Sequence, residues 1–267
     1  MIRMELAMSR LAAVLFVTLG ATFGAALPVA AQFENEELDA LELSVADLAG
    51  NFPAFASFPW TESNSERAYL YGDAKGVVHL KVSDGTRTRE AWRSFPLEGT
   101  IRYVLAADLD RDGKSEIVAA TSGPRIYVWD SKEYDLLWES VDEKFESLQA
   151  IAIEDVDRDE SLEIVLVVDN KVSYYDGTEF FREKEGRDVV DPTEILIGDV
   201  DGDLSREIIT NDGYVIDTET LNIEWATDGF GYPISLFDVD SDGVPELLGE
   251  IDGAITIWDI KERREVW

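Results

Sequence analysis

Four short acidic segments carry most of the chemistry that this sequence could perform. Each has carboxylates at positions 1, 3, 5 and 9 of a nine-residue frame, and the four frames are residues 108–116, 155–163, 199–207 and 238–246, here loops 1 to 4. The carboxylates are Asp108, Asp110, Asp112 and Glu116 in loop 1; Asp155, Asp157, Asp159 and Glu163 in loop 2; Asp199, Asp201, Asp203 and Glu207 in loop 3; and Asp238, Asp240, Asp242 and Glu246 in loop 4. Alternate side chains of a tight loop converge on one point, and Ca²⁺ takes six to eight oxygen ligands. The pattern therefore predicts up to four Ca²⁺ sites.

Position 7 of each frame fits the same geometry through its backbone carbonyl, which belongs to Lys114, Ser161, Ser205 and Val244. A single His and no Cys argue against zinc and softer metals, and Mg²⁺ prefers stricter octahedral sites. Gly113 and Gly243 occupy position 6 of loops 1 and 4, where a residue without Cβ turns easily, so these two loops rank first. The alternative is that the segments are acidic turns that bind no specific ion.

Every loop lies within the same succession of predicted strands. An apolar strand precedes it (103–107, 150–153, 195–197 and 234–237), and a second follows it (117–120, 164–168, 208–210 and 247–248). A third strand ends at an Asp (126–130, 172–176, 214–217 and 255–259), and a fourth carries Trp138, Phe181, Trp225 or Trp267. Recurring strands of β-branched and aromatic residues at roughly 40–50 residues per repeat predict an all-β fold, a β-propeller of four-stranded antiparallel blades. We expect the Trp and Tyr residues of the third and fourth strands to pack in the core.

A weaker copy of the repeat precedes the other four. Asp84 and Trp92 reproduce the Asp-to-Trp spacing of eight residues, but Phe58, Trp60 and Glu62 stand at loop positions 1, 3 and 5, so this copy is not expected to bind metal. The sequence thus predicts about five blades in residues 53–267, at 53–98, 99–146, 147–188, 189–229 and 230–267. The sequence leaves open whether five blades close into a ring or the chain is part of a larger propeller.

The N-terminal region has the pattern of a secretory signal. Arg3 and Arg10 flank the start of an apolar stretch, and small residues before Gln32 fit a cleavage site, so residues 1–31 are predicted to be removed and the protein to be secreted or periplasmic. No second apolar stretch is long enough to span a bilayer, so no stable membrane insertion is expected after cleavage. Residues 32–52 are predicted to be a short helix or an acidic leader.

The formal net charge of −33 is strongly acidic. Nucleic acids and anionic membrane surfaces would repel such a chain, whereas cations would not. Four divalent ions would offset only part of the excess, and adaptation to a salty environment is a competing reason for it.

These residues and their spacing resemble the FG-GAP/VCBS repeat family, the calcium-binding propeller repeats of integrin α-subunits and many secreted bacterial proteins. The family motif D-x-D-x-D-G-x-x-E is complete in loops 1 and 4 and lacks only the Gly in loops 2 and 3. The resemblance implies Ca²⁺ in the loop between the first and second strands of a blade. The Phe-Gly and Gly-Ala-Pro elements that name the family are nearly absent, with Phe230-Gly231 and Pro233 as a partial match. Members of the family usually carry more blades.

The sequence favours a non-enzymatic Ca²⁺-binding module that interacts with an extracellular protein or glycan, as in adhesion. No G-x-S-x-G, H-E-x-x-H or phosphate-loop motif occurs. Two alternatives stay open: a propeller enzyme, either a lyase or a quinoprotein-like dehydrogenase, and a structural assembly component.

Overall fold

The computed structural model describes residues 54–60 and 66–267. The expected signal segment (1–31), the expected helix or leader (32–52) and Glu62 lie outside these residues. Within them the secondary structure is almost entirely β, with one 3₁₀ turn, η2 (Ser140–Asp142). No helix in this part of the chain is long and apolar enough to cross a membrane.

The strands form five four-stranded antiparallel sheets, and within each sheet neighbours in space are neighbours in sequence. We call these sheets blades 1 to 5. Blade 1 contains β1 (Phe55–Pro59), β2 (Arg67–Gly72), β3 (Val78–Ser83) and β4 (Thr88–Arg93); blade 2 contains β5 (Ile101–Ala107), β6 (Glu116–Thr121), β7 (Ile126–Trp129) and β8 (Leu136–Glu139). Blade 3 contains β9 (Leu148–Glu154), β10 (Glu163–Val168), β11 (Lys171–Asp176) and β12 (Arg182–Glu185). Blade 4 contains β13 (Ile195–Gly198), β14 (Glu207–Thr210), β15 (Tyr214–Asp217) and β16 (Ile223–Ala226); blade 5 contains β17 (Ile234–Phe237), β18 (Glu246–Ile251), β19 (Ala254–Asp259) and β20 (Arg264–Glu265).

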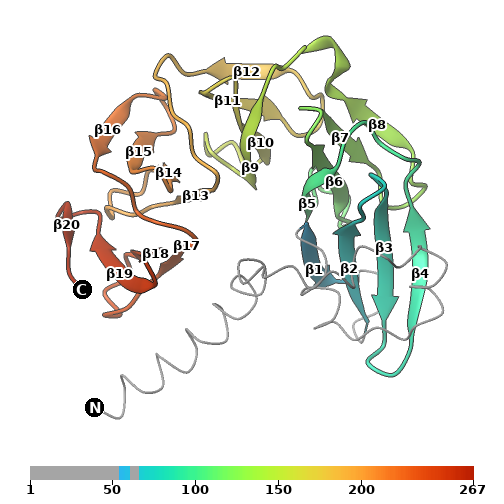
Figure 1. Ribbon diagram of the computed structural model, residues 1–267, viewed down its shortest axis with the longest axis horizontal. Coiled ribbons are helices and arrows are strands. Elements are labelled where there is room, and N and C mark those ends of the chain that lie inside the picture. The colour runs from blue at the N-terminus through green and yellow to red at the C-terminus, as the bar shows by residue number, and fades with distance from the viewer. Residues whose placement is uncertain (1–53, 61–65) are drawn as a thin grey trace. The chain divides into compact units, whose positions relative to one another are not determined.

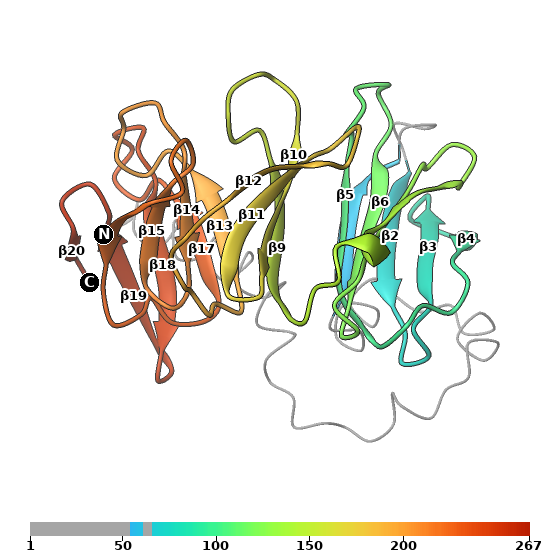
Figure 2. The ribbon, with the colours of Figure 1, turned by 90° about the horizontal axis from the view of Figure 1, so that it is seen from above.

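The chain divides into two compact units, each of which is described by itself. The first unit ends at Lys144 and holds blades 1 and 2, and the second begins at Phe145 and holds blades 3, 4 and 5. Figure 1 shows the four strands of each sheet, and Figure 2 shows the second unit from another side, with the sheets of blades 4 and 5 face to face.

Blades 1 and 2 pack through their faces in the first unit. Leu70 and Leu80 of blade 1 share one buried cluster with Ile117 of blade 2. At the outer strand, Trp92 stacks on Tyr134 with ring centroids 5.5 Å apart. Alternation along each strand gives every sheet an apolar face for this contact.

Blade 4 is buried on both of its faces in the second unit. Ile208 packs in the cluster shared with blade 3, and the next residue, Ile209, packs in the cluster shared with blade 5. Because successive side chains of a strand point to opposite faces, the central residues of a strand between two blades are apolar on both faces. The sequence Ile208-Ile209 of β14 meets that requirement.

The predicted all-β fold of five four-stranded antiparallel sheets is confirmed, and differences appear at the ends of two outer strands. Phe181 precedes β12 and is 51% exposed, and Trp267 follows β20 and is 69% exposed. The expectation that Trp267 packs in the core is wrong, because β20 is only two residues long and ends before it. Trp225 does pack against the core, as expected.

Candidate metal sites

Each loop joins the first strand of a blade to the second, and its position-9 Glu is the first residue of the second strand in blades 2 to 5. The carboxylate of this Glu accepts a hydrogen bond from the backbone N–H of position 2. The donor nitrogens are those of Leu109 (2.7 Å), Val156 (2.8 Å), Val200 (3.0 Å) and Val239 (2.7 Å). This hydrogen bond links the start of each loop to the first residue of the second strand.

The Asp residues hold the loop backbone in a repeated pattern. In loop 4, Gly243 N–H donates to Asp238 (3.1 Å) and Val244 N–H donates to Asp242 (2.8 Å). The N–H of Asp242 donates to Asp240 at 3.0 Å. Bonds from position 5 to the position-3 carboxylate and from position 7 to the position-5 carboxylate recur in loops 1, 2 and 3. All four loops therefore have one conformation.

This conformation brings carboxylates together to within 4.8 Å of one another. The groups are Asp108, Asp110 and Glu116; Asp155, Asp157 and Glu163; Asp199, Asp201 and Asp203; Asp201, Glu207 and Glu224; and Asp238, Asp240 and Glu246. Positions 1, 3 and 9 thus converge in loops 1, 2 and 4. The position-5 residues Asp112, Asp159 and Asp242 are outside these groups, and their carboxylates accept the position-7 N–H.

The residues of loop 1 fit a hard cation on one further observation. Oδ1 of Asp108 is buried and has no hydrogen-bond partner among the described residues. A buried carboxylate oxygen without a partner is costly, and a cation held by Asp108, Asp110 and Glu116 would satisfy it. An all-oxygen donor set of this kind suits Ca²⁺.

The position-9 glutamates have perturbed acid–base properties. Burial raises the pKa of Glu116 to about 7. The hydrogen bond from the Leu109 N–H lowers this pKa, whereas the nearby carboxylate of Asp110 raises it further. Burial likewise raises the pKa of Glu163 to about 8 and that of Glu207 to about 7, and it raises the pKa of Glu246. Closely spaced carboxylates favour a proton or a cation in their midst.

The loop backbone is left-handed at two positions in every copy. Position 6 has φ of 85° at Gly113, 72° at Glu160, 77° at Leu204 and 96° at Gly243. Position 4 has φ of 61° at Arg111, 66° at Arg158, 79° at Gly202 and 68° at Ser241. The sequence identified the requirement at position 6 correctly, and loops 2 and 3 meet it with residues that pay a steric cost there.

In blade 1 the corresponding segment has no such cluster among its described residues. Phe58 and Trp60 stand at positions 1 and 3 and pack against the core that blades 1 and 2 share. The absence of metal binding in this copy stays a prediction, because position 5 of the segment, Glu62, lies outside the described residues.

Sequence reasoning missed two outer-strand carboxylates near loops 2 and 3. Glu224 of β16 joins Asp201 and Glu207, and the carboxylates of Asp157 and Asp159 act on Glu183 of β12. Burial raises the pKa of Glu224, and Asp217, Asp201 and Asp203 raise it further, whereas Arg263 acts in the opposite direction. Each Glu follows the Asp at the end of the third strand by seven residues, a spacing that could have revealed both.

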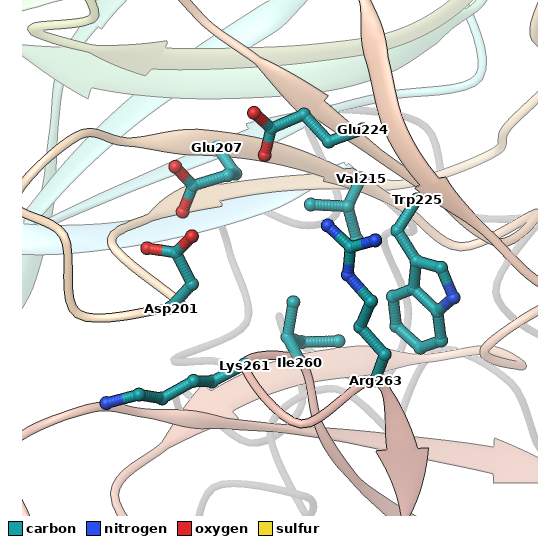
Figure 3. Close-up of a pocket in the computed structure, with 8 residues that line it drawn as sticks. All are labelled: Asp201, Glu207, Val215, Glu224, Trp225, Ile260, Lys261 and Arg263. Carbon is teal, nitrogen blue, oxygen red and sulfur yellow. The ribbon is translucent and has the colours of Figure 1, made fainter.

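A small pocket lies beside loop 3, between blades 4 and 5 (Figure 3). It is lined by Asp201, Glu207, Val215, Glu224 and Trp225 of blade 4 and by Ile260, Lys261 and Arg263 of blade 5. Carboxylates occupy one side of it, and basic side chains from the next blade occupy another.

No protein-family model matches the sequence, and a search of curated proteins gives no match. Solved structures do match. BBS1N, solved in complex with ARL6DN, has a TM-score of 0.59 and 11% identity over 81% of this chain and 67% of its own. Sqt1 of Saccharomyces cerevisiae has a TM-score of 0.57 and 11% sequence identity, and the match covers 77% of this chain and 58% of Sqt1. The V. cholerae biofilm matrix protein Bap1 has a TM-score of 0.56 and 19% sequence identity, and the match covers 81% of this chain and 39% of Bap1.

These likenesses define the class of fold: the five sheets have a β-propeller-like architecture, as BBS1N and Bap1 do. The chain spans about two thirds of BBS1N and a smaller share of the other two proteins.

Exchanging the position-6 residues of loops 3 and 4 tests the backbone strain. We expect Gly243→Leu to destabilise the protein by about 1 kcal/mol, because a side chain with Cβ is strained at positive φ. We expect Leu204→Gly to stabilise it by a few tenths of a kcal/mol, since relief of strain exceeds the entropy of the added Gly. Leu204 is 76% exposed, so little packing is lost. Urea unfolding in chelator measures the free energy of unfolding of both variants. Changes of the same sign and size in the two variants would contradict the strain at position 6.

The raised pKa values of Glu116, Glu163 and Glu207 predict the pH dependence of the metal-free protein. A carboxyl whose folded-state pKa lies above its unfolded value stabilises the fold when protonated. That contribution is complete below the ordinary pKa of 4.5 and is lost as pH rises through about 7 to 8. Urea unfolding in chelator should therefore show stability that falls between pH 5 and pH 8.5. A variant with all three residues changed to Gln should show a flatter profile, and parallel profiles would refute the assignment.

Proposed function

We propose that this protein is a secreted or periplasmic calcium-binding propeller module that interacts with a protein or glycan and performs no catalysis. The unpartnered buried Oδ1 of Asp108, beside Asp110 and Glu116, is the observation that carries the calcium proposal. Repetition of the same loop conformation in three further blades extends it to loops 2, 3 and 4.

The side chains at positions 1, 3, 5 and 9 and the carbonyl at position 7 would hold the ion. Ca²⁺ would neutralise the clustered carboxylates, whose repulsion otherwise raises the free energy of the folded state. Because the position-9 Glu begins the second strand, a bound ion would also tie that strand to the end of the first. The ion would thus serve to rigidify each of blades 2 to 5.

An interaction role is supported by the architecture and by the charge. In blades 2 to 5 the turn between the second and third strands lies at the opposite end from the acidic loop, so a partner could bind there without displacing an ion. A net charge of −33 disfavours nucleic acid as that partner. The biofilm matrix protein Bap1 and BBS1N, which is bound to ARL6DN, share this type of fold and lend support to a binding role.

Calcium should raise the thermal stability of the protein. At a free Ca²⁺ concentration of 100 times Kd, one site adds about 2.7 kcal/mol to the free energy of unfolding. Asp108→Asn combined with Asp110→Asn should remove one site's share of the shift, whereas the exposed control Glu133→Gln should keep the full shift. Scanning calorimetry with Ca²⁺ and with chelator measures it, and an absent shift at low ionic strength would sink the calcium proposal.

Export should remove residues 1–31. Expression in a bacterial host followed by intact-mass analysis of the exported protein should give a chain that begins at Gln32. Retention of the full chain in the membrane or cytoplasm would contradict the secretion proposal while leaving calcium binding untouched.

A further inference from the structure

The turn between β19 and β20 places two basic side chains against loop 3. Lys261 and Arg263 line the pocket that Asp201, Glu207 and Glu224 line from the other blade (Figure 3). The Lys261 Nζ lies 3.6 Å from the position that a Cβ on Gly202 would occupy, so the ammonium group is next to the loop backbone.

Arg263 occupies a turn position that blades 2, 3 and 4 fill with an aromatic or aliphatic residue. The residue four positions after the Asp that ends the third strand is Tyr134, Phe180, Leu221 or Arg263, and all four have φ between 54° and 60°. Tyr134 stacks on Trp92 of the preceding blade, and Leu221 is buried in the core between blades 3 and 4. The fifth blade therefore presents a cation where the shared turn geometry presents an apolar side chain to the preceding blade.

The pocket combines charges of both signs in one place. Three carboxylates lie within 4.8 Å of one another, and the buried Glu207 among them is 2% exposed. The guanidinium of Arg263 points from the turn toward Val215 and Glu224 (Figure 3). The residue equivalent to Glu224 is Leu137 in the blade of loop 1 and Val266 in the blade of loop 4. Loop 3 therefore has an additional carboxylate beside it that loops 1 and 4 lack.

We propose that Lys261 and Arg263 form an electrostatic clamp that neutralises the carboxylates of loop 3 in the absence of a metal ion and holds blade 5 against blade 4. The clamp competes with a cation for these carboxylates. Loop 3 therefore binds Ca²⁺ more weakly in the native protein than it would if Lys261 and Arg263 were uncharged. Only this competition rests on the proposed calcium function; the metal-free clamp does not.

The metal-free clamp is tested by neutralising both basic residues in the full chain. In chelator at low salt, Lys261→Gln/Arg263→Gln should melt at a lower temperature than the parent, and the difference should shrink at about 0.5 M NaCl, where the Debye length is only a few ångströms. Arg264→Gln is the matched control, because Arg264 adjoins the turn but pairs with Asp259 at 3.7 Å outside the pocket. Adding Glu224→Gln should restore part of the lost stability. A double variant that melts like Arg264→Gln, or strictly additive effects with Glu224→Gln, would overturn the clamp.

The competition is tested with Tb³⁺, a luminescent substitute for Ca²⁺ that Trp225 in the same pocket can sensitise. Asp110→Asn, Asp157→Asn and Asp240→Asn first weaken the other three loops. In this background Lys261→Gln/Arg263→Gln should bind Tb³⁺ about three- to tenfold more tightly, as expected for removal of two screened charges several ångströms away. Equal affinities would refute the competition. No Tb³⁺ binding in either protein, with the metal-free effect intact, would end the calcium assignment at loop 3 and support the clamp as its internal counter-ion.

Discussion

The hydrogen bond between the position-9 Glu carboxylate and the position-2 N–H is the constraint on which the other features of each loop depend. In register, this Glu lies opposite the last residue of the first strand, as Glu116 lies opposite Ala107 and Glu246 opposite Phe237. The strand pairing therefore fixes the backbone position of this Glu independently of the loop conformation. With one oxygen occupied by the backbone, the rest of the carboxylate lies among the Asp side chains. The register of two strands thus determines the geometry of a charged cluster.

Neighbouring loops of the second unit also contact one another. Arg206, at position 8 of loop 3, donates hydrogen bonds to the carboxylate of Glu154 and to the carbonyl of Asp155 at the start of loop 2. A Cβ on Gly202 would lie 2.8 Å from a methyl carbon of Val244 in loop 4, so loops 3 and 4 also touch. Loops 2, 3 and 4 consequently form one continuous acidic rim, and a change in one loop reaches the next through defined contacts.

The sequence was sufficient to predict features that depend on residues close together in the chain. The strands, their grouping into five sheets and the loop carboxylates follow from alternation, spacing and residue type. The pairing of Glu224 with Asp201 could not be derived in this way, because it depends on where the outer strand folds back. The positions of Lys261 and Arg263 depend on how blade 5 packs on blade 4. The left-handed backbone at Arg111, Arg158 and Ser241 could not be predicted from the sequence, because Arg and Ser do not mark a position with positive φ as Gly does. The exposure of Trp267 does not follow from the repeat pattern, because that pattern does not show how far the last outer strand extends.

Each sheet is built from one uninterrupted stretch of chain, with every strand hydrogen-bonded to its neighbours in sequence. The contacts that define a blade are therefore short in sequence separation, a topology that permits early formation of each hairpin during folding. Such a unit can be duplicated or deleted in one genetic event without rewiring the remaining sheets. Blade 1 shows the same independence at the level of a single loop, because its sheet is complete although Phe58 and Trp60 replace the acidic residues. Architecture and ion chemistry can thus diverge separately, one repeat at a time.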